Sequence, residues 1–102
     1  NITIKMALND HMRGILENLI DQALSITPIY LNMVRQNAPP EFGIQNKQDY
    51  TLGIVQGLIM GQFLGLYRGS FAQDPTPNIM AEAGGIIHKR TREIRDAIFK
   101  AG

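Results

Sequence analysis

The sequence predicts an all-α fold, a bundle of three helices whose core is completed by dimerisation. Residues 7–35 and 77–100 carry apolar side chains at helical spacing, and between these two blocks a glycine recurs at every fourth position. Read as a strand, the glycine block would be far longer than ordinary strands, and no other stretch alternates with period two over a useful length. The 102 residues match the size of one ordinary domain, so we expect residues 1–102 to form a single all-helical domain.

The first predicted helix covers residues 7–35. Its polar residues share one side of the helical wheel, and its apolar residues share a broad face on the other side. That face holds Leu8, Met12, Ile15, Leu16, Leu19, Ile20, Ala23, Ile26, Tyr30, Met33 and Val34. Asn9 or Asp10 is the expected N-cap. The apolar phase continues through Pro28, so we expect a kink there; a fresh helix starting at Thr27-Pro28 is the alternative.

The central helix is predicted from its N-cap, Asp49, to about Ala72. It contains a row of five glycines at positions 53, 57, 61, 65 and 69, which we call the glycine stripe. Each glycine inside a helix costs roughly 0.8–1 kcal/mol relative to alanine, so the five together cost about 4–5 kcal/mol. This cost is comparable to the whole stability of a small domain, so we expect a close contact against the bare backbone to offset it.

The spacing of four residues places the glycine stripe along one inclined row of the helix surface. The opposite, bulky face holds Val55, Ile59, Phe63 and Leu66, with Met60 and Tyr67 beside them. Three partners for the stripe stay open: small residues of the last helix, the same stripe of a second copy about a two-fold axis, and a ligand that approaches the backbone. The small residues are Ala81, Ala83, Gly84 and Gly85. For a homodimer, the predicted interface residues are Gly57, Leu58, Gly61 and Gly65.

The last predicted helix covers residues 77–100, after a connector at 37–48 and a short loop at 73–78. Thr76 is its expected N-cap, and Pro77 takes the first helical position. Its apolar face holds Ile79, Met80, Ala83, Ile86, Ile87, Ile94, Ala97 and Ile98. Arg90 lies within this face, so we expect a structural ion pair or a side chain that reaches to the edge of the core; anion binding is the alternative.

The opposite face of the last helix carries a basic stripe of His88, Lys89, Arg92 and Arg95. Such a row is a candidate contact for nucleic-acid phosphates or for an acidic protein partner. The pairs Lys89–Glu93 and Arg92–Asp96 are spaced i,i+4, however, and such pairs are typical of an ordinary solvated face. A small nucleic-acid-binding protein is therefore the second function that we consider.

No pattern in the sequence predicts a catalytic residue, a metal site or a cofactor. Cysteine is absent, which excludes a disulfide scaffold and a thiolate nucleophile, and neither histidine has a ligand at the spacing of a helix-borne metal site. Glu17 and Asp21 lie four residues apart and could pair for acid–base chemistry. They lie on the predicted water-facing side of the first helix, however, where no apolar pocket would prepare either carboxyl group for such chemistry. A ligand-binding or enzymatic site at a dimer seam, built around Arg68 or Arg90, is the third function that we consider.

The overall charge and hydropathy indicate a protein without a strongly charged partner. The net charge of +1 gives no global attraction to nucleic acid or anionic lipid. Residues 50–71 are long enough to span a membrane, but two glutamines and five glycines lower their hydropathy, so a stable span is not favoured. The first residues lack the layout of a secretion signal. We therefore predict a cytoplasmic, self-associating structural or interaction module, a homodimer that also has room for another protein partner.

Overall fold

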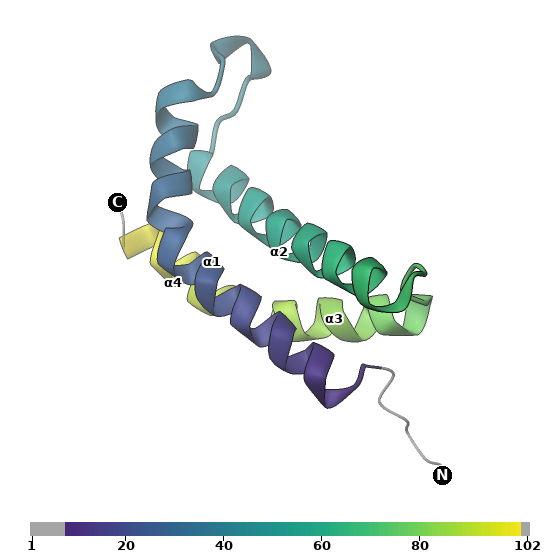
Figure 1. Ribbon diagram of the computed structural model, residues 1–102. Helices are drawn as coiled ribbons and strands as arrows, with labels where there is room; N and C mark the ends of the chain where they lie inside the picture. Colours follow the sequence, from purple (N-terminus) through teal and green to yellow (C-terminus); the bar gives the residue numbers. More distant parts are fainter. Residues whose placement is uncertain (1–7, 101–102) are drawn as a thin grey trace.

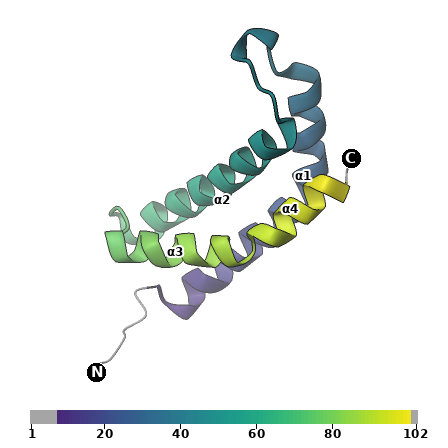
Figure 2. The same cartoon turned by 180° about the vertical axis from the view of Figure 1, so that it is seen from behind.

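The computed structural model describes residues 8–100, and this part of the chain is all-α, as the sequence predicts. Its helices are α1 (Asp10–Asn37), α2 (Lys47–Phe71), α3 (Pro77–Lys89) and α4 (Thr91–Lys100), with a short 3-10 turn, η1 (Pro40–Phe42), between α1 and α2. Helices α1 and α2 form a long hairpin (Figure 1). Seen from behind, α3 and α4 follow one another along one side of this hairpin (Figure 2). The other side of the hairpin is left without a covering helix from the described residues.

The prediction of one continuous helix over residues 77–100 is wrong, because the helix is interrupted at Arg90. Arg90 has φ −102° and ψ 5°, outside the helical range. The carbonyl of Ile87 accepts two hydrogen bonds, from the Arg90 amide at 3.1 Å and from the Thr91 hydroxyl at 3.1 Å. These donors occupy the carbonyl that the next turn of helix would use, which is how a threonine side chain competes with helical bonding. The chain therefore changes direction slightly before α4 begins.

Helix α1 continues through Pro28 without interruption, and Figure 1 shows it bending along its length, in agreement with the predicted kink. Proline has no amide hydrogen to donate to the carbonyl one turn earlier, so the helix loses one backbone bond at this place. The hydroxyl of the neighbouring Thr27 is fully buried and donates to the Ala23 carbonyl at 2.7 Å. At the start of α1, Asn9 is the N-cap and accepts a hydrogen bond from the Met12 amide at 2.8 Å.

The N-caps of the other helices show one correction. Asn46, and not Asp49, caps α2: its side-chain oxygen accepts a hydrogen bond from the Asp49 amide at 2.9 Å. Asp49 stands in the first turn, where a negative charge favours the helix dipole. Thr76 caps α3 as predicted, accepting from the Ile79 amide at 3.2 Å.

The buried row of α2 repeats every four residues, as the glycine stripe does. It consists of Thr51, Val55, Ile59, Phe63 and Tyr67. Because this row is two residues out of phase with the glycines, it lies about 200° away from them around the helix axis, on the opposite side. Leu66, which the sequence assigned to the bulky face, is 44% exposed, so that assignment is wrong.

The buried row of α1 is narrower than the predicted apolar face. After Pro28 it follows Leu31 and Val34, and the fully buried Thr27 precedes them. Met33, predicted to face the core, is 49% exposed, and Tyr30 is only half-buried. Apolar side chains of the second half of α1 are thus left over after the core is filled, on the flank that faces the start of α2.

Candidate functional site

The glycine stripe has no close partner within the described chain. All five of its glycines are exposed, and a Cβ atom built on any of them would meet no described atom within 4 Å. A Cβ atom built on Gly84 or Gly85 of α3 would likewise meet no described atom within 4 Å. The interpretation that the stripe packs against small residues of the last helix is therefore wrong for residues 8–100. The helix-propensity cost of the five glycines is not offset inside this part of the chain.

Two uncharged rows, each with three apolar residues and one glutamine, border the glycine stripe about a quarter turn from it. One row is Ile54, Leu58, Gln62 and Leu66, and the other is Leu52, Gln56, Met60 and Leu64. Between residues 50 and 67 no side chain is charged. The four predicted interface residues, Gly57, Leu58, Gly61 and Gly65, therefore lie together on an uncharged outer face of α2, with exposed glycine backbone at its centre.

The basic stripe is exposed along α3 and α4, at His88, Lys89, Arg92 and Arg95. The predicted pair Lys89–Glu93 does not form, because the interruption at Arg90 breaks the i,i+4 spacing and Arg90 itself binds Glu93 at 2.8 Å. The predicted pair Arg92–Asp96 is also not among the ion pairs of residues 8–100. The structure therefore leaves these cations without the neutralising partners that the sequence suggested.

An exposed aromatic ring lies beside the basic stripe. The guanidinium carbon of Arg95 is 5.1 Å from the centre of the Phe99 ring, within the range of a cation–π interaction. Phe99 is one of the large apolar side chains that remain exposed in the described part of the chain. The stripe thus combines positive charge with one accessible ring.

Arg90 joins α1 to the junction of α3 and α4. Its guanidinium donates to Glu17 at 3.1 Å, to Asp21 at 2.7 Å and to Glu93 at 2.8 Å, and its side chain is 20% exposed. The hydrogen bonds to Glu93, Asp21 and Glu17 raise the pKa of Arg90, against the opposing effect of burial. The hydrogen bond from Arg90 in turn lowers the pKa of Glu93. The predicted structural ion pair is thereby confirmed, and both α1 carboxylates considered for acid–base chemistry bind this cation.

Arg68, the other arginine considered for a seam site, lies at the end of α2 and forms an exposed ion pair with Asp74. A second link between α1 and α3 comes from Arg13, which donates to the carboxylate of Glu82. The structure does not bring Arg68 and Arg90 together, because one lies at the far end of α2 and the other at the junction of α3 and α4. The described residues contain no group of three or more His, Asp or Glu side chains arranged to hold a metal ion.

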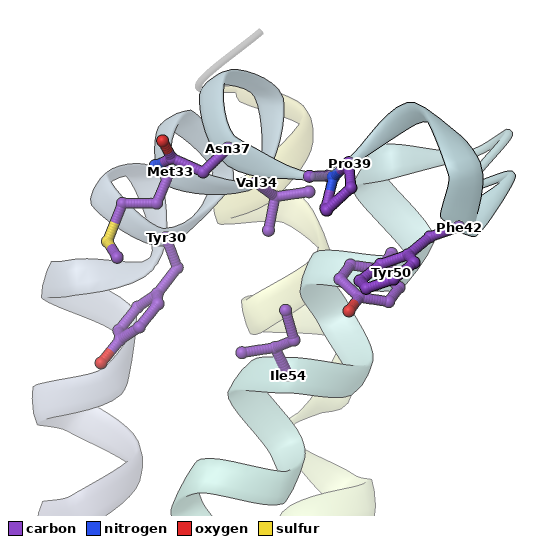
Figure 3. Close-up of a pocket in the computed structure, with 9 residues that line it drawn as sticks. Tyr30, Met33, Val34, Asn37, Pro39, Phe42, Tyr50 and Ile54 are labelled. Carbon is purple, nitrogen blue, oxygen red and sulfur yellow. The ribbon is translucent and has the colours of Figure 1, made fainter.

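An apolar cavity of about 340 Å³, not expected from the sequence, lies between the second half of α1 and the start of α2 and is open to solvent on one side. Figure 3 shows Tyr30 and Met33 on the α1 wall, Phe42 and Tyr50 on the opposite wall, and Ile54 at the base. Its lining residues are Tyr30, Met33, Val34, Asn37, Ala38, Pro39, Phe42, Tyr50 and Ile54. None of them is charged. Helix α4 lies behind the cavity in this view, so the opening is on the uncovered side of the hairpin (Figure 3).

One signal in the sequence pointed to this cavity. The apolar face predicted for the first helix was broader than a single packed neighbour needs, and its surplus members Tyr30 and Met33 line the cavity wall. The connector adds Phe42, a large apolar residue among prolines and polar residues. An apolar excess after a helical proline therefore marks the position, although not the shape, of the cavity.

Compared with protein-family models, with curated proteins and with solved structures, the chain has no match. Within the described residues, no helix combines the length and the hydropathy needed to cross a membrane. The features of the described residues that bear on function are therefore the glycine stripe, the basic stripe and the cavity.

Proposed function

We propose that this protein is a self-associating structural or interaction module, a homodimer in which the glycine stripe of α2 meets the stripe of a second copy. One observation carries the proposal: five helical glycines are exposed with no described atom against them. A helix that keeps five glycines costs about 4–5 kcal/mol in propensity, and a contact outside the described chain is the simplest way to offset that cost.

The chemistry of the outer face of α2 favours a second copy as the partner. Residues 50–67 offer no charge to a charged partner, whereas an uncharged glycine and leucine surface matches another surface of the same kind. The stripe also has a natural centre at Gly61, with two glycines on each side. A two-fold axis through this centre sets Gly61 of one copy against Gly61 of the other.

The geometry of such a pair follows from the four-residue spacing. Rows of this spacing pack at a crossing angle near −50°, and the bare backbone allows the two helix axes to approach closely. The contact would cover Leu58 together with the glycines. In this arrangement the three helical units of each chain, α1, α2 and α3–α4, form a bundle that dimerisation completes.

The test is the solution mass, measured by light scattering, of the wild type and of Gly61→Leu. A Cβ atom at Gly61 meets no described atom of its own chain within 4 Å and the position is exposed, so the variant should fold while losing the contact. We expect a wild-type dimer and a folded Gly61→Leu monomer, with the helix content checked by circular dichroism. Gly14→Leu is the matched control, because Gly14 is also an exposed helical glycine with open space around it, and it should stay dimeric. A monomeric wild type, or a dimeric Gly61→Leu, would refute the proposal.

Nucleic-acid binding is the second candidate function, and the lack of ion-pair partners for the basic stripe favours it. Arg92 and Arg95 stay exposed without an ion-pair partner in the described residues, and Phe99 beside them offers a ring for stacking. Dimerisation would present two such stripes on one particle.

The test of this second function is salt-dependent retention on heparin, followed by binding to a labelled single-stranded oligonucleotide. The double variant Arg92→Glu/Arg95→Glu should abolish both. The control Lys47→Glu/Arg68→Glu changes the net charge by the same amount away from the stripe and should leave both unchanged. Equal losses in the two variants would show that overall charge, and not the stripe, is responsible.

A further inference from the structure

Beyond self-association, we propose that the cavity between α1 and α2 is a binding site for a small, uncharged aromatic molecule. The site lies on the uncovered side of the hairpin, and the glycine stripe contributes no residue to it. The inference therefore does not rest on the proposed dimer.

The fold builds this cavity. Helix α1, which contains Pro28, bends away from α2 in its second half, and the connector with η1 joins the two helices at that end (Figure 1). Leu31 and Val34 remain buried beneath it, so the kinked arm is anchored to the core. The cavity is thus a consequence of a proline inside a packed helix.

Large apolar side chains are exposed at the cavity wall. Met33 is 49% exposed, Tyr50 43% and Phe42 66%, although all three line the same cavity. Exposed apolar surface loses roughly 25 cal/mol of favourable burial for each Å², and contiguous exposed apolar patches on proteins often mark binding sites. An apolar ligand would withdraw these side chains from water together.

The volume and lining define the class of ligand. An enclosed cavity of about 150 Å³ suffices for benzene. This cavity has about 340 Å³ and is open to solvent on one side, so it leaves room for a fused two-ring molecule that keeps one edge in water. Aromatic rings stand on both walls, Tyr30 on one and Phe42 with Tyr50 on the other (Figure 3), and flat rings pack well against such walls.

The absence of charge selects for a neutral molecule. No lining residue carries a charge, so a charged ligand would give up part of its hydration without gaining an ion-pair partner. The hydroxyls of Tyr30 and Tyr50 and the amide of Asn37 can serve one hydroxyl or carbonyl group on the ligand.

The experiment is titration calorimetry of the full chain with 2-naphthol and with 2-naphthoate. The first probe is a neutral two-ring molecule with one hydroxyl, and the second replaces the hydroxyl with a charged carboxylate. We expect saturable binding of one 2-naphthol for each chain and at least tenfold weaker binding of 2-naphthoate. Gly61→Leu should bind 2-naphthol like the wild type, which separates this proposal from the dimer.

Two pairs of variants locate the site. Ala38→Phe places a ring in the cavity and should weaken 2-naphthol binding at least tenfold, whereas Ala81→Phe, at an exposed alanine of α3, should not change it. Met33→Lys places a cation at the wall and should raise the affinity for 2-naphthoate about threefold, the size of an exposed ion pair. Ile29→Lys, one turn earlier on α1, exposed and outside the lining, should not.

The result that overturns the proposal is the absence of saturable 2-naphthol binding, equal affinity for the two probes, or equal loss in Ala38→Phe and Ala81→Phe. If 2-naphthol instead converts a wild-type dimer into monomers, a second copy of the chain occupies the cavity, and the small-molecule assignment is wrong. Light scattering of the titrated sample separates this outcome from ordinary binding.

Discussion

Replacing two glycines of the stripe with alanine should raise the stability of the folded chain and lower the affinity of self-association. In Gly57→Ala/Gly65→Ala, each new methyl group meets no described atom within 4 Å, so it adds helix propensity without a clash. The gain is roughly 0.8–1 kcal/mol for each position, or about 2 kcal/mol for the pair. For a domain of this size, that corresponds to a rise in Tm of roughly 10 °C.

The same two methyl groups should weaken a dimer built on the stripe. Methyl groups inserted into a close backbone contact hold the helices apart, and overpacking of this kind costs about 1–3 kcal/mol, so the dissociation constant should rise about tenfold or more. Urea unfolding at protein concentrations below and far above that constant separates the two effects. The variant should be more stable than the wild type when dilute, and its advantage should shrink when concentrated.

If the dilute variant were less stable than the wild type, the stripe would be packed within its own chain, contrary to the prediction. An unchanged dissociation constant would instead show that the stripe is not the contact. Gly43→Ala serves as a control, because this glycine-to-alanine change should lower the stability of the fold where the stripe variant raises it. Gly43 has φ +65°, and alanine in this left-handed conformation should cost about 1 kcal/mol at every protein concentration.

Further predictions concern the ion pairs of Arg90 and the N-cap of α2. Arg90→Met should lower the free energy of unfolding by about 1–2 kcal/mol at neutral pH, because it leaves the carboxylates of α1 and α4 without their shared partner; unfolding by urea measures this loss. Arg90 lowers the pKa of Glu93 in the folded protein, so this stabilisation is present above the ordinary pKa of 4.5 and is lost as the pH falls further. The difference in the free energy of unfolding between the wild type and Arg90→Met should therefore narrow on acidification. Asn46→Ala should lower the free energy of unfolding by about 1 kcal/mol, whereas Asp49→Ala should lower it less, because only Asn46 caps α2. Equal losses for the two variants in thermal unfolding would contradict the observed cap.

Much of the fold was predictable because helical periodicity is a local property of the chain. The all-α class, the continuation of α1 through Pro28 and the cap at Thr76 all follow from residues close together in sequence. The interruption at Arg90 was not predictable in this way. Its cause includes the Thr91 hydroxyl on the Ile87 carbonyl and the reach of Arg90 to α1, and only the folded chain brings α1 to that position.

The candidate sites were predictable only in part. The position and spacing of the glycine stripe followed from the sequence, but its exposure did not, because a wheel shows which residues share a face and not what covers that face. The pairing of Glu93 with Arg90, and not with Lys89, depends on where the helix ends. The cavity depends on the direction in which the kink at Pro28 turns the chain, which sequence periodicity does not contain.

The shared four-residue repeat of the buried row and the glycine stripe has a consequence for changes in the length of α2. Loss of one residue near the middle of the helix would turn everything beyond it by about 100°, so the second half of each row would point to a different neighbour. Insertion of four residues would leave both rows continuous and lengthen the helix by about 6 Å. A change of four residues turns the second half of α2 by only about 40°, so it should be tolerated better than a change of one residue.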